Sequence, residues 1–166
     1  MLSKQLLELA DRYAGLETRV GRLMNNACGP VCAACPKICC RAEMCRESVE
    51  SPFLSLVRNR AKAKPAWSDE HGWLGPDGCR LSLGRPPVCY EFLCPAILKA
   101  RPDASSQTRL QDLAGVLTRA GKRAIGHDHL VEIMTRERLS QVKPGRLAAH
   151  LDRAETELLE LESFWL

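Results

Sequence analysis

Six of the chain's nine cysteines fall between residues 28 and 45, in the segment CGPVCAACPKICCRAEMC. The other three form a second block: Cys79, Cys89 and Cys94. The thiolate form of cysteine binds zinc and the irons of iron–sulfur clusters, and four thiolates complete a tetrahedral site. Two residues between cysteines, as in CAAC with Cys32 and Cys35, let one short loop supply two adjacent corners. The spacing therefore predicts bound metal.

The ligands are expected to come from both blocks and to converge on one metal centre or on two neighbouring ones. The turn-forming GRPP sequence would fold Cys79 back toward Cys89. Adjacent side chains normally point in different directions, so Cys39 and Cys40 are not expected to bind the same ion, and one of them could serve a second site or pack in the interior. The expected metal ligands are Cys32, Cys35, Cys39, Cys40, Cys79, Cys89 and Cys94.

Five further residues remain open as ligands: Cys28, Cys45, His71, His127 and His129. His127 and His129 would share a face on a strand, although polar residues at the start of an element show the same pattern. Seven thiols exceed the four ligands of a single structural zinc, which leaves room for two metals or for an iron–sulfur cluster with neighbouring structural thiols. Arg80 and Arg85, beside the second block, would offset thiolate charge. Zinc and an iron–sulfur cluster both remain candidate cofactors.

Two known signatures are close to this pattern. Cys28, Cys32 and Cys35 read CxxxCxxC, the spacing by which radical-SAM enzymes hold their cluster. That family usually has an aromatic residue before the third cysteine, where this chain has Ala34. The family's barrel also needs a longer run of alternating strands and helices than 166 residues with this pattern supply. We therefore set the radical-SAM interpretation aside.

The second signature joins CAACPKICC to the downstream GCRLSLGRPPVCYEFLCP. Over roughly residues 28 to 95 this combination resembles the YkgJ-type cysteine-cluster family, a zinc- or iron-chelating domain named for its CxxCxxCC signature. In that family a Gly-Cys pair follows the first cluster, and an Arg-Pro pair then precedes another cysteine and an aromatic residue. Those steps fall here on Gly78, Cys79, Arg85, Pro86, Cys89 and Phe92. Here three residues, rather than the signature's two, precede the CC pair. The resemblance implies metal binding and leaves the reaction open.

Outside the cysteine segments, apolar residues recur at alternating steps of four and three, which is typical of one face of a helix. These stripes predict helices near residues 2 to 24, 105 to 122 and 144 to 163. Asp103, Ser105 or Ser106 could cap the second helix, and Pro144 suits the first turn of the third. Packed antiparallel, such helices bury one another's stripes.

The middle of the chain differs from its two ends in amino-acid composition. Nine of the ten prolines lie between Cys28 and Pro102, which breaks regular structure and calls for a metal to hold the loops. CRLSL, VCYEFL and, at 129 to 134, HLVEIM are candidate short strands. The expected fold is mainly α, with one small antiparallel helical domain over 1–166. Flanking helices lie at 1–27 and 103–166. Between them, at 28–100, we expect an irregular cysteine- and proline-rich metal-binding insert that includes a few short β-strands.

Composition limits the class of protein. A hydrophobic content of 45% is enough to fill a core. The first twenty residues carry charges throughout, and no apolar stretch is long enough to span a bilayer, so we expect a cytoplasmic protein without membrane contact. In that reducing compartment thiols stay free unless metal or catalysis occupies them. The net charge of +4 falls short of the basic face of a nucleic-acid binder, so nucleic acid is not an expected partner.

The sequence therefore predicts a metal-binding protein that holds zinc or an iron–sulfur cluster through cysteine thiolates. Such a module would act in metal handling, electron transfer or recognition of a protein partner. The alternative is an iron–sulfur redox or protein-modifying enzyme, or a subunit of one, that uses the cluster in catalysis. The flagellin lysine methylases, which carry a similar cluster, are one example. The sequence leaves open whether the protein is an enzyme.

Overall fold

The computed structural model describes residues 2–37, 39–76 and 78–165. Helices hold 62% of the described residues, and strands with isolated bridges 5%, so the fold is mainly α with a small two-stranded sheet, as the sequence predicts. The elements in chain order are α1 Lys4–Ala33, α2 Ala42–Cys45, α3 Glu47–Glu50, α4 Pro52–Arg58, β1 Leu74–Gly75, β2 Gly78–Cys79, α5 Val88–Glu91, α6 Pro95–Lys99, α7 Ala104–Ala114, α8 Val116–Gly121, the 3-10 turn η1 Leu130–Glu132, α9 Arg136–Leu139 and α10 Pro144–Trp165. Among the described residues, no helix combines the length and the apolar character needed to cross a membrane.

The three predicted helices are all present, with changed boundaries. The first begins after Ser3, whose hydroxyl accepts a hydrogen bond from the Leu6 amide at 3.2 Å, and it continues through Pro30 to Ala33. The second is divided at Gly115 into α7 and α8, and Asp103 caps its start by accepting from the Ser106 amide at 2.7 Å. The third, α10, begins at Pro144 as expected.

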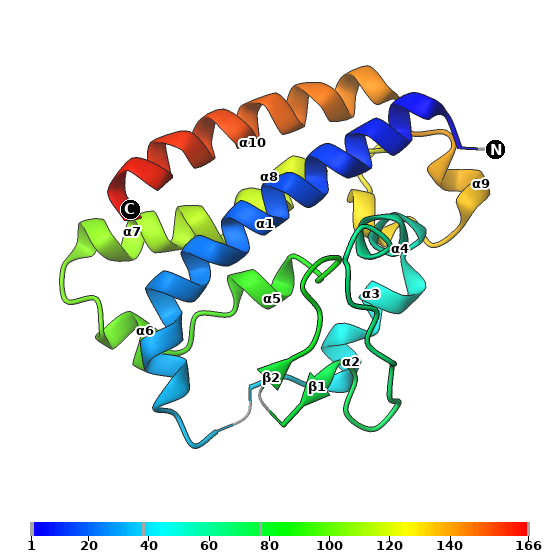
Figure 1. Cartoon of the computed structure of the whole chain (residues 1–166). Coiled ribbons are helices and arrows are strands. Elements are labelled where there is room, and N and C mark those ends of the chain that lie inside the picture. Colours follow the sequence, from blue (N-terminus) through cyan, green and yellow to red (C-terminus); the bar gives the residue numbers. More distant parts are fainter. Residues whose placement is uncertain (1, 38, 77, 166) are drawn as a thin grey trace.

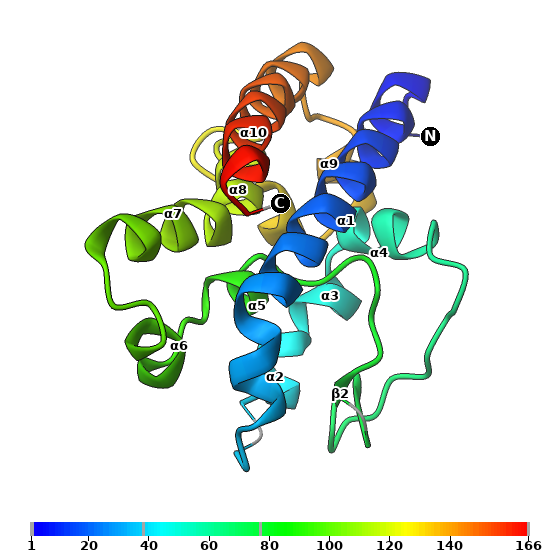
Figure 2. The ribbon, with the colours of Figure 1, turned by 60° about the vertical axis from the view of Figure 1, so that its left-hand side comes forward.

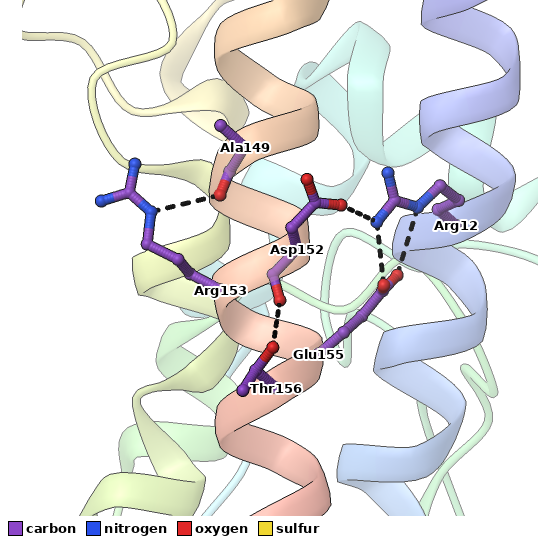
Figure 3. Close-up of polar contacts among 6 residues, drawn as sticks. All are labelled: Arg12, Ala149, Asp152, Arg153, Glu155 and Thr156. Carbon is purple, nitrogen blue, oxygen red and sulfur yellow. Dashed lines mark hydrogen bonds and ion pairs between the residues drawn. The ribbon is translucent and has the colours of Figure 1, made fainter.

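Helices α1 and α10 lie side by side and run in the same direction (Figure 1). Arg12 on α1 pairs with Asp152 and Glu155 on α10, and Arg19 pairs with Glu162 further along both helices. Figure 3 shows Arg12 reaching across to the two carboxylates. Because these charged side chains flank the buried stripes, they fix the register of the two helices.

The segment α7–α8 runs the opposite way along α10. Arg119 on α8 pairs with Glu157, and the guanidinium of Arg109 on α7 lies 4.6 Å from the ring centroid of Phe164, near the end of α10. Consecutive long helices are therefore antiparallel, as predicted, which leaves the first and third parallel to each other. Their apolar faces meet α4 in a shared core, where the rings of Tyr13 and Phe53 pack edge to face at 5.1 Å.

The small sheet follows the prediction only at Cys79. Strands β1 and β2 pair antiparallel, with Leu74 opposite Cys79 and Gly75 opposite Gly78. The rest of the CRLSL segment, after Cys79, lies outside the strand. The hairpin therefore places one cysteine on a short, fixed element.

The other two strand predictions are wrong. VCYEFL begins as the helix α5, because the preceding Pro87 already has helical backbone angles (φ −52°, ψ −35°) and serves as its N-cap. HLVEIM contains η1, at whose start the His129 ring accepts from the Val131 amide and the Glu132 carboxylate accepts from the His129 amide. In both segments a helical turn forms against the β propensity of the residues inside them, after Pro87 in the first and with side-chain capping in the second.

Candidate metal centre

The elements that carry cysteine gather around the C-terminal end of α1. Figure 2 shows α2 and β2 beside the lower part of α1, α6 on the other side of that helix, α5 nearer its middle and α10 at the top of the view. All nine cysteines are free thiols. Cys28 and Cys32 lie in α1, Cys45 in α2, Cys79 in β2, Cys89 in α5 and Cys94 at the N-cap of α6, while Cys35, Cys39 and Cys40 lie in the connection between α1 and α2.

The last turns of α1 and the start of α6 bring together a first set of thiols. Cys28 and Cys32 are one helical turn apart, so their side chains share a face of α1. Helix α6 packs against α1, and Cys94 at its start lies in the same apolar cluster as Cys28. Cys35 follows directly after the helix, where its amide donates to the Cys32 carbonyl at 3.1 Å.

The electrostatics of these thiols show which ones are neighbours. Burial, with smaller contributions from the nearby thiols of Cys32 and Cys94, raises the pKa of the Cys28 thiol to about 11. Burial also raises the pKa of Cys32, with added contributions from Cys94, Cys39 and Cys35. We call this set the first thiol group: Cys28, Cys32, Cys35, Cys39 and Cys94.

A second set of thiols lies between α2, the hairpin and α5. The buried Cys45 at the end of α2 packs with Trp73 and Leu81, and Cys79 on β2 lies against the same cluster. At Gly72, with φ +61°, a Cβ would come within 3.3 Å of the Cys45 Cβ, so this turn approaches α2 closely. Helix α5, which carries Cys89, contacts α2.

The shifted pKa values join Cys40 to this set. Burial, with smaller contributions from the thiols of Cys45, Cys79 and Cys40, raises the pKa of Cys89 to about 12. Burial likewise raises the pKa of Cys40, followed by the effects of Cys79 and Cys45. We call Cys40, Cys45, Cys79 and Cys89 the second thiol group. The adjacent residues Cys39 and Cys40 thus belong to different groups, in line with the sequence argument that they point in different directions.

One carboxylate on α1 holds the loop that joins Cys79 to Cys89. The buried Glu17 accepts hydrogen bonds from the Gly84 amide at 2.8 Å and the Arg85 amide at 2.9 Å. Gly84 has φ +76°, and a Cβ there would come within 2.8 Å of the Leu54 carbonyl, so a glycine suits this close approach to α4. The loop between the two cysteines is therefore anchored to the helical core.

Each thiol group has an arginine beside it. Arg85, whose Nε donates to the Leu81 carbonyl at 2.7 Å, lowers the pKa of Cys40, Cys45 and Cys89 in opposition to burial. Arg101, which donates to the Ala27 carbonyl, does the same for Cys28. Both guanidinium groups favour the thiolate form that a metal requires.

The histidines left open by the sequence lie in other surroundings. His71 has a side chain that is 62% exposed and faces Glu70 at 3.6 Å. His127 is exposed. Both ring nitrogens of His129 are engaged, since Nδ1 accepts from the Val131 amide at 3.3 Å and Nε2 lies 2.9 Å from the Thr118 carbonyl. His129 therefore has a structural role at the start of η1.

Within residues 2–37, 39–76 and 78–165, no three His, Cys, Asp or Glu side chains are already arranged so that they could hold a metal ion. The thiols of each group are neighbours rather than a complete coordination sphere. A cysteine side chain can change rotamer about a single bond without moving its backbone. Soft thiolates are the donors that zinc and iron–sulfur clusters select, so the chemistry of the donor set fits either cofactor.

The structure places Cys28 and Cys45, which the sequence leaves open, next to cysteines of the expected set: Cys28 packs near Cys94 and Cys45 near Cys79. They are the two buried cysteines of the chain, and one lies in each thiol group. The spacing of four between Cys28 and Cys32 is the signal that could have identified the first of them. The apolar stripe predicts a helix that ends near residue 24, before Cys28 and Cys32, so the sequence gives no reason to place the two cysteines on one helical face.

Known proteins give no further guide to this site. No family model, curated protein or solved structure matches the chain. The resemblance of its cysteine motifs to the YkgJ-type family remains a prediction. Metal binding likewise remains a prediction, which rests on the chain's own thiols.

Proposed function

We propose that the protein binds zinc or an iron–sulfur cluster through cysteine thiolates at the C-terminal end of α1. The observation that carries this proposal is the gathering of nine free thiols from segments that are far apart in the sequence. A buried position can be filled by any small apolar residue, so packing alone does not require cysteine. Convergence of so many thiols is explained if they share a cation.

The electrostatic situation of the thiols supports the same function. Burial raises the pKa of Cys28, Cys32, Cys40, Cys45 and Cys89, and neighbouring thiols add a smaller increase. A bound cation reverses this effect, since coordination deprotonates a thiol outright. Arg85 and Arg101 would offset part of the remaining negative charge.

The role that fits this arrangement is a module for metal handling, electron transfer or partner recognition in the cytoplasm, where free thiols persist. The test is the metal content of the full chain purified without oxygen. Brown protein that contains iron and acid-labile sulfide supports a cluster, and colourless protein that contains zinc supports a zinc site. Protein with neither metal in stoichiometric amount would contradict the proposal.

Single substitutions connect the metal to the thiols. Cys35→Ser and Cys89→Ser, one from each thiol group, should both lower the metal content, because a serine hydroxyl is a harder and far less acidic ligand. Ala34→Ser is a matched control, since it introduces the same side chain at an exposed position beside Cys35 without removing a thiol. Undiminished metal in both cysteine variants would place the metal elsewhere.

A further inference from the structure

We infer that Cys32 and Cys35 form a reversible disulfide, so that the CAAC segment at the end of α1 is a thiol–disulfide redox pair. The inference goes beyond the proposed function, because it concerns a bond between two thiols rather than a bound metal. Two sulfurs joined in a disulfide are no longer thiolate ligands. The bridge would therefore also make metal binding sensitive to oxidation, and that consequence alone rests on the proposed function.

The backbone already holds the two cysteines at bridging distance. The Cys35 amide donates to the Cys32 carbonyl at 3.1 Å, and Ala34 between them has φ −87° and ψ −6°. These angles after the helical Ala33 give the geometry of a type I turn, whose first and fourth Cα atoms lie less than about 7 Å apart. Disulfides join residues whose Cα atoms are about 4.4–6.8 Å apart. The turn therefore suits a bridge between its two ends.

The two thiols are also accessible and adjustable. Cys32 is exposed and Cys35 is half-buried, so a small reagent can reach the pair. Cys35 lies outside the helix, so its side chain can turn toward Cys32 without breaking helical hydrogen bonds. Pro30 has no amide hydrogen, so the last turns of α1 lack one helical hydrogen bond. Closing the bridge should therefore need only a local change.

The neighbouring pair of Cys28 and Cys32 is less suited to a bridge. The two residues are one turn apart within α1, and side chains so placed have Cβ atoms about 5–6 Å apart. A disulfide needs a Cβ separation of about 3.5–4.5 Å. Cys28 is also buried and packs with Ile97 and Leu110, which it would have to leave. The helix therefore favours Cys35 as the partner of Cys32.

The bond would form by exchange with a low-molecular-weight disulfide such as oxidised glutathione. The thiolate of the exposed Cys32 attacks one sulfur of that disulfide, and the first glutathione leaves as a thiol. The Cys35 thiolate then attacks the Cys32 sulfur of the mixed disulfide, and the second glutathione leaves. The two cysteine thiols lose two electrons and two protons, and the glutathione disulfide gains them as two thiols. Excess reduced glutathione drives the same steps backwards.

Equilibration in glutathione buffers tests this pairing. The full chain, after removal of bound metal, is equilibrated with mixtures of reduced and oxidised glutathione, and its free thiols are then alkylated. Trypsin releases residues 23–37, whose cysteines are Cys28, Cys32 and Cys35. Fragmentation of this peptide in a mass spectrometer should show an alkyl group on Cys28 and a bond between the other two. The linked fraction should rise with the share of oxidised glutathione and fall again when reduced glutathione is added.

Three variants identify the role of each thiol. Cys28→Ala is the matched control, because it keeps a small apolar residue at the buried position, and it should leave the linked fraction unchanged. Cys32→Ser should abolish the link. Cys35→Ser should leave one glutathione attached to Cys32, because the thiol that would displace it is missing.

Two results for the wild type would overturn the inference. One is a bridge that joins Cys28 to either of the other cysteines in residues 23–37, and the other is a peptide that stays unlinked in oxidised glutathione alone. A large loss of the far-ultraviolet helical signal on linkage would also contradict it, since the turn already has the geometry of the bridge. The metal content of the reduced chain is measured separately, so each of these results leaves the proposed function in place.

Discussion

Tyr90 donates its hydroxyl to Glu17 Oε1 at 3.0 Å, which ties the cysteine-bearing loop to the middle of α1. Both residues are buried, at 4% and 0% exposed. Because Glu17 also accepts from the amides of Gly84 and Arg85, one carboxylate orders the segment that leads from the hairpin to α5. The second thiol group thus depends on a polar contact inside the helical core.

Removal of the Tyr90 hydroxyl should destabilise the protein. Tyr90→Phe deletes a hydrogen bond to a buried charged group, and a bond of that kind contributes about 1.5–3 kcal/mol. Tyr13→Phe is the matched control, because among the described residues the buried Tyr13 hydroxyl has no hydrogen-bond partner. Urea unfolding should show a loss for Tyr90→Phe and none for Tyr13→Phe. Equal losses would mean that the Tyr90–Glu17 bond adds nothing beyond packing.

Titration of Glu17 should appear in the pH dependence of stability. Burial raises its pKa above the ordinary 4.5, against the opposing effect of its three hydrogen bonds. The folded state therefore holds the Glu17 proton more tightly than the unfolded state, and this contribution is present below about pH 4.5 and is lost as the pH rises through the folded pKa. The free energy of unfolding of the wild type minus that of Glu17→Gln should fall as the pH rises above about 4.5. A difference that grows over this range would show that the hydrogen bonds outweigh burial.

The ion pair between Arg19 and Glu162 should couple α1 to α10. Arg19 bonds both carboxylate oxygens, at 2.9 and 2.7 Å, and the Glu162 side chain is only 15% exposed. A double-mutant cycle should give a coupling of about 0.5–1 kcal/mol at neutral pH. Arg19 lowers the pKa of Glu162, so the coupling should disappear as the pH falls through that lowered value. The pair Lys4–Glu8, with side chains 91% and 61% exposed, is the control and should show almost none.

Metal removal should loosen the cysteine region and spare the long helices. The core formed by α1, α4, α7, α8 and α10 is built from buried apolar residues, whereas residues 28 to 100 contain the thiols and short elements. After chelation, hydrogen exchange should accelerate in α2, β1, β2 and α5, while most of the far-ultraviolet helical signal persists. Complete unfolding on chelation would show that the metal organises the whole chain.

The long helices could be predicted because their causes are local. The stripe from Leu6 to Leu23 is buried on α1, Asp103 caps α7, and Pro144 begins α10, all as the spacing and capping rules suggest. The extension of α1 through Pro30 could not be predicted in this way, because glycine and proline normally mark a helix end. That missed extension carries Cys28 and Cys32.

The site could be predicted only in part. The sequence alone pointed to cysteine and to its two blocks as candidate ligands. It could not assign thiols to groups, because that depends on how α6 packs on α1 and how the hairpin packs on α2. The same limit applies to Cys45. The sequence does not decide whether it is a ligand, because its packing against Trp73 and Leu81 is visible only in the structure.

X-ray absorption at the edge of the metal found in the purified chain is the measurement that tests thiolate binding most directly, because it identifies the atoms bonded to the metal. For zinc, the account predicts a first shell of about four sulfur atoms near 2.3 Å; for iron, it predicts a sulfur shell as in a cysteine-held cluster. A first shell of nitrogen or oxygen near 2.0–2.2 Å would contradict it, since the metal would then be bound away from the thiols at the end of α1.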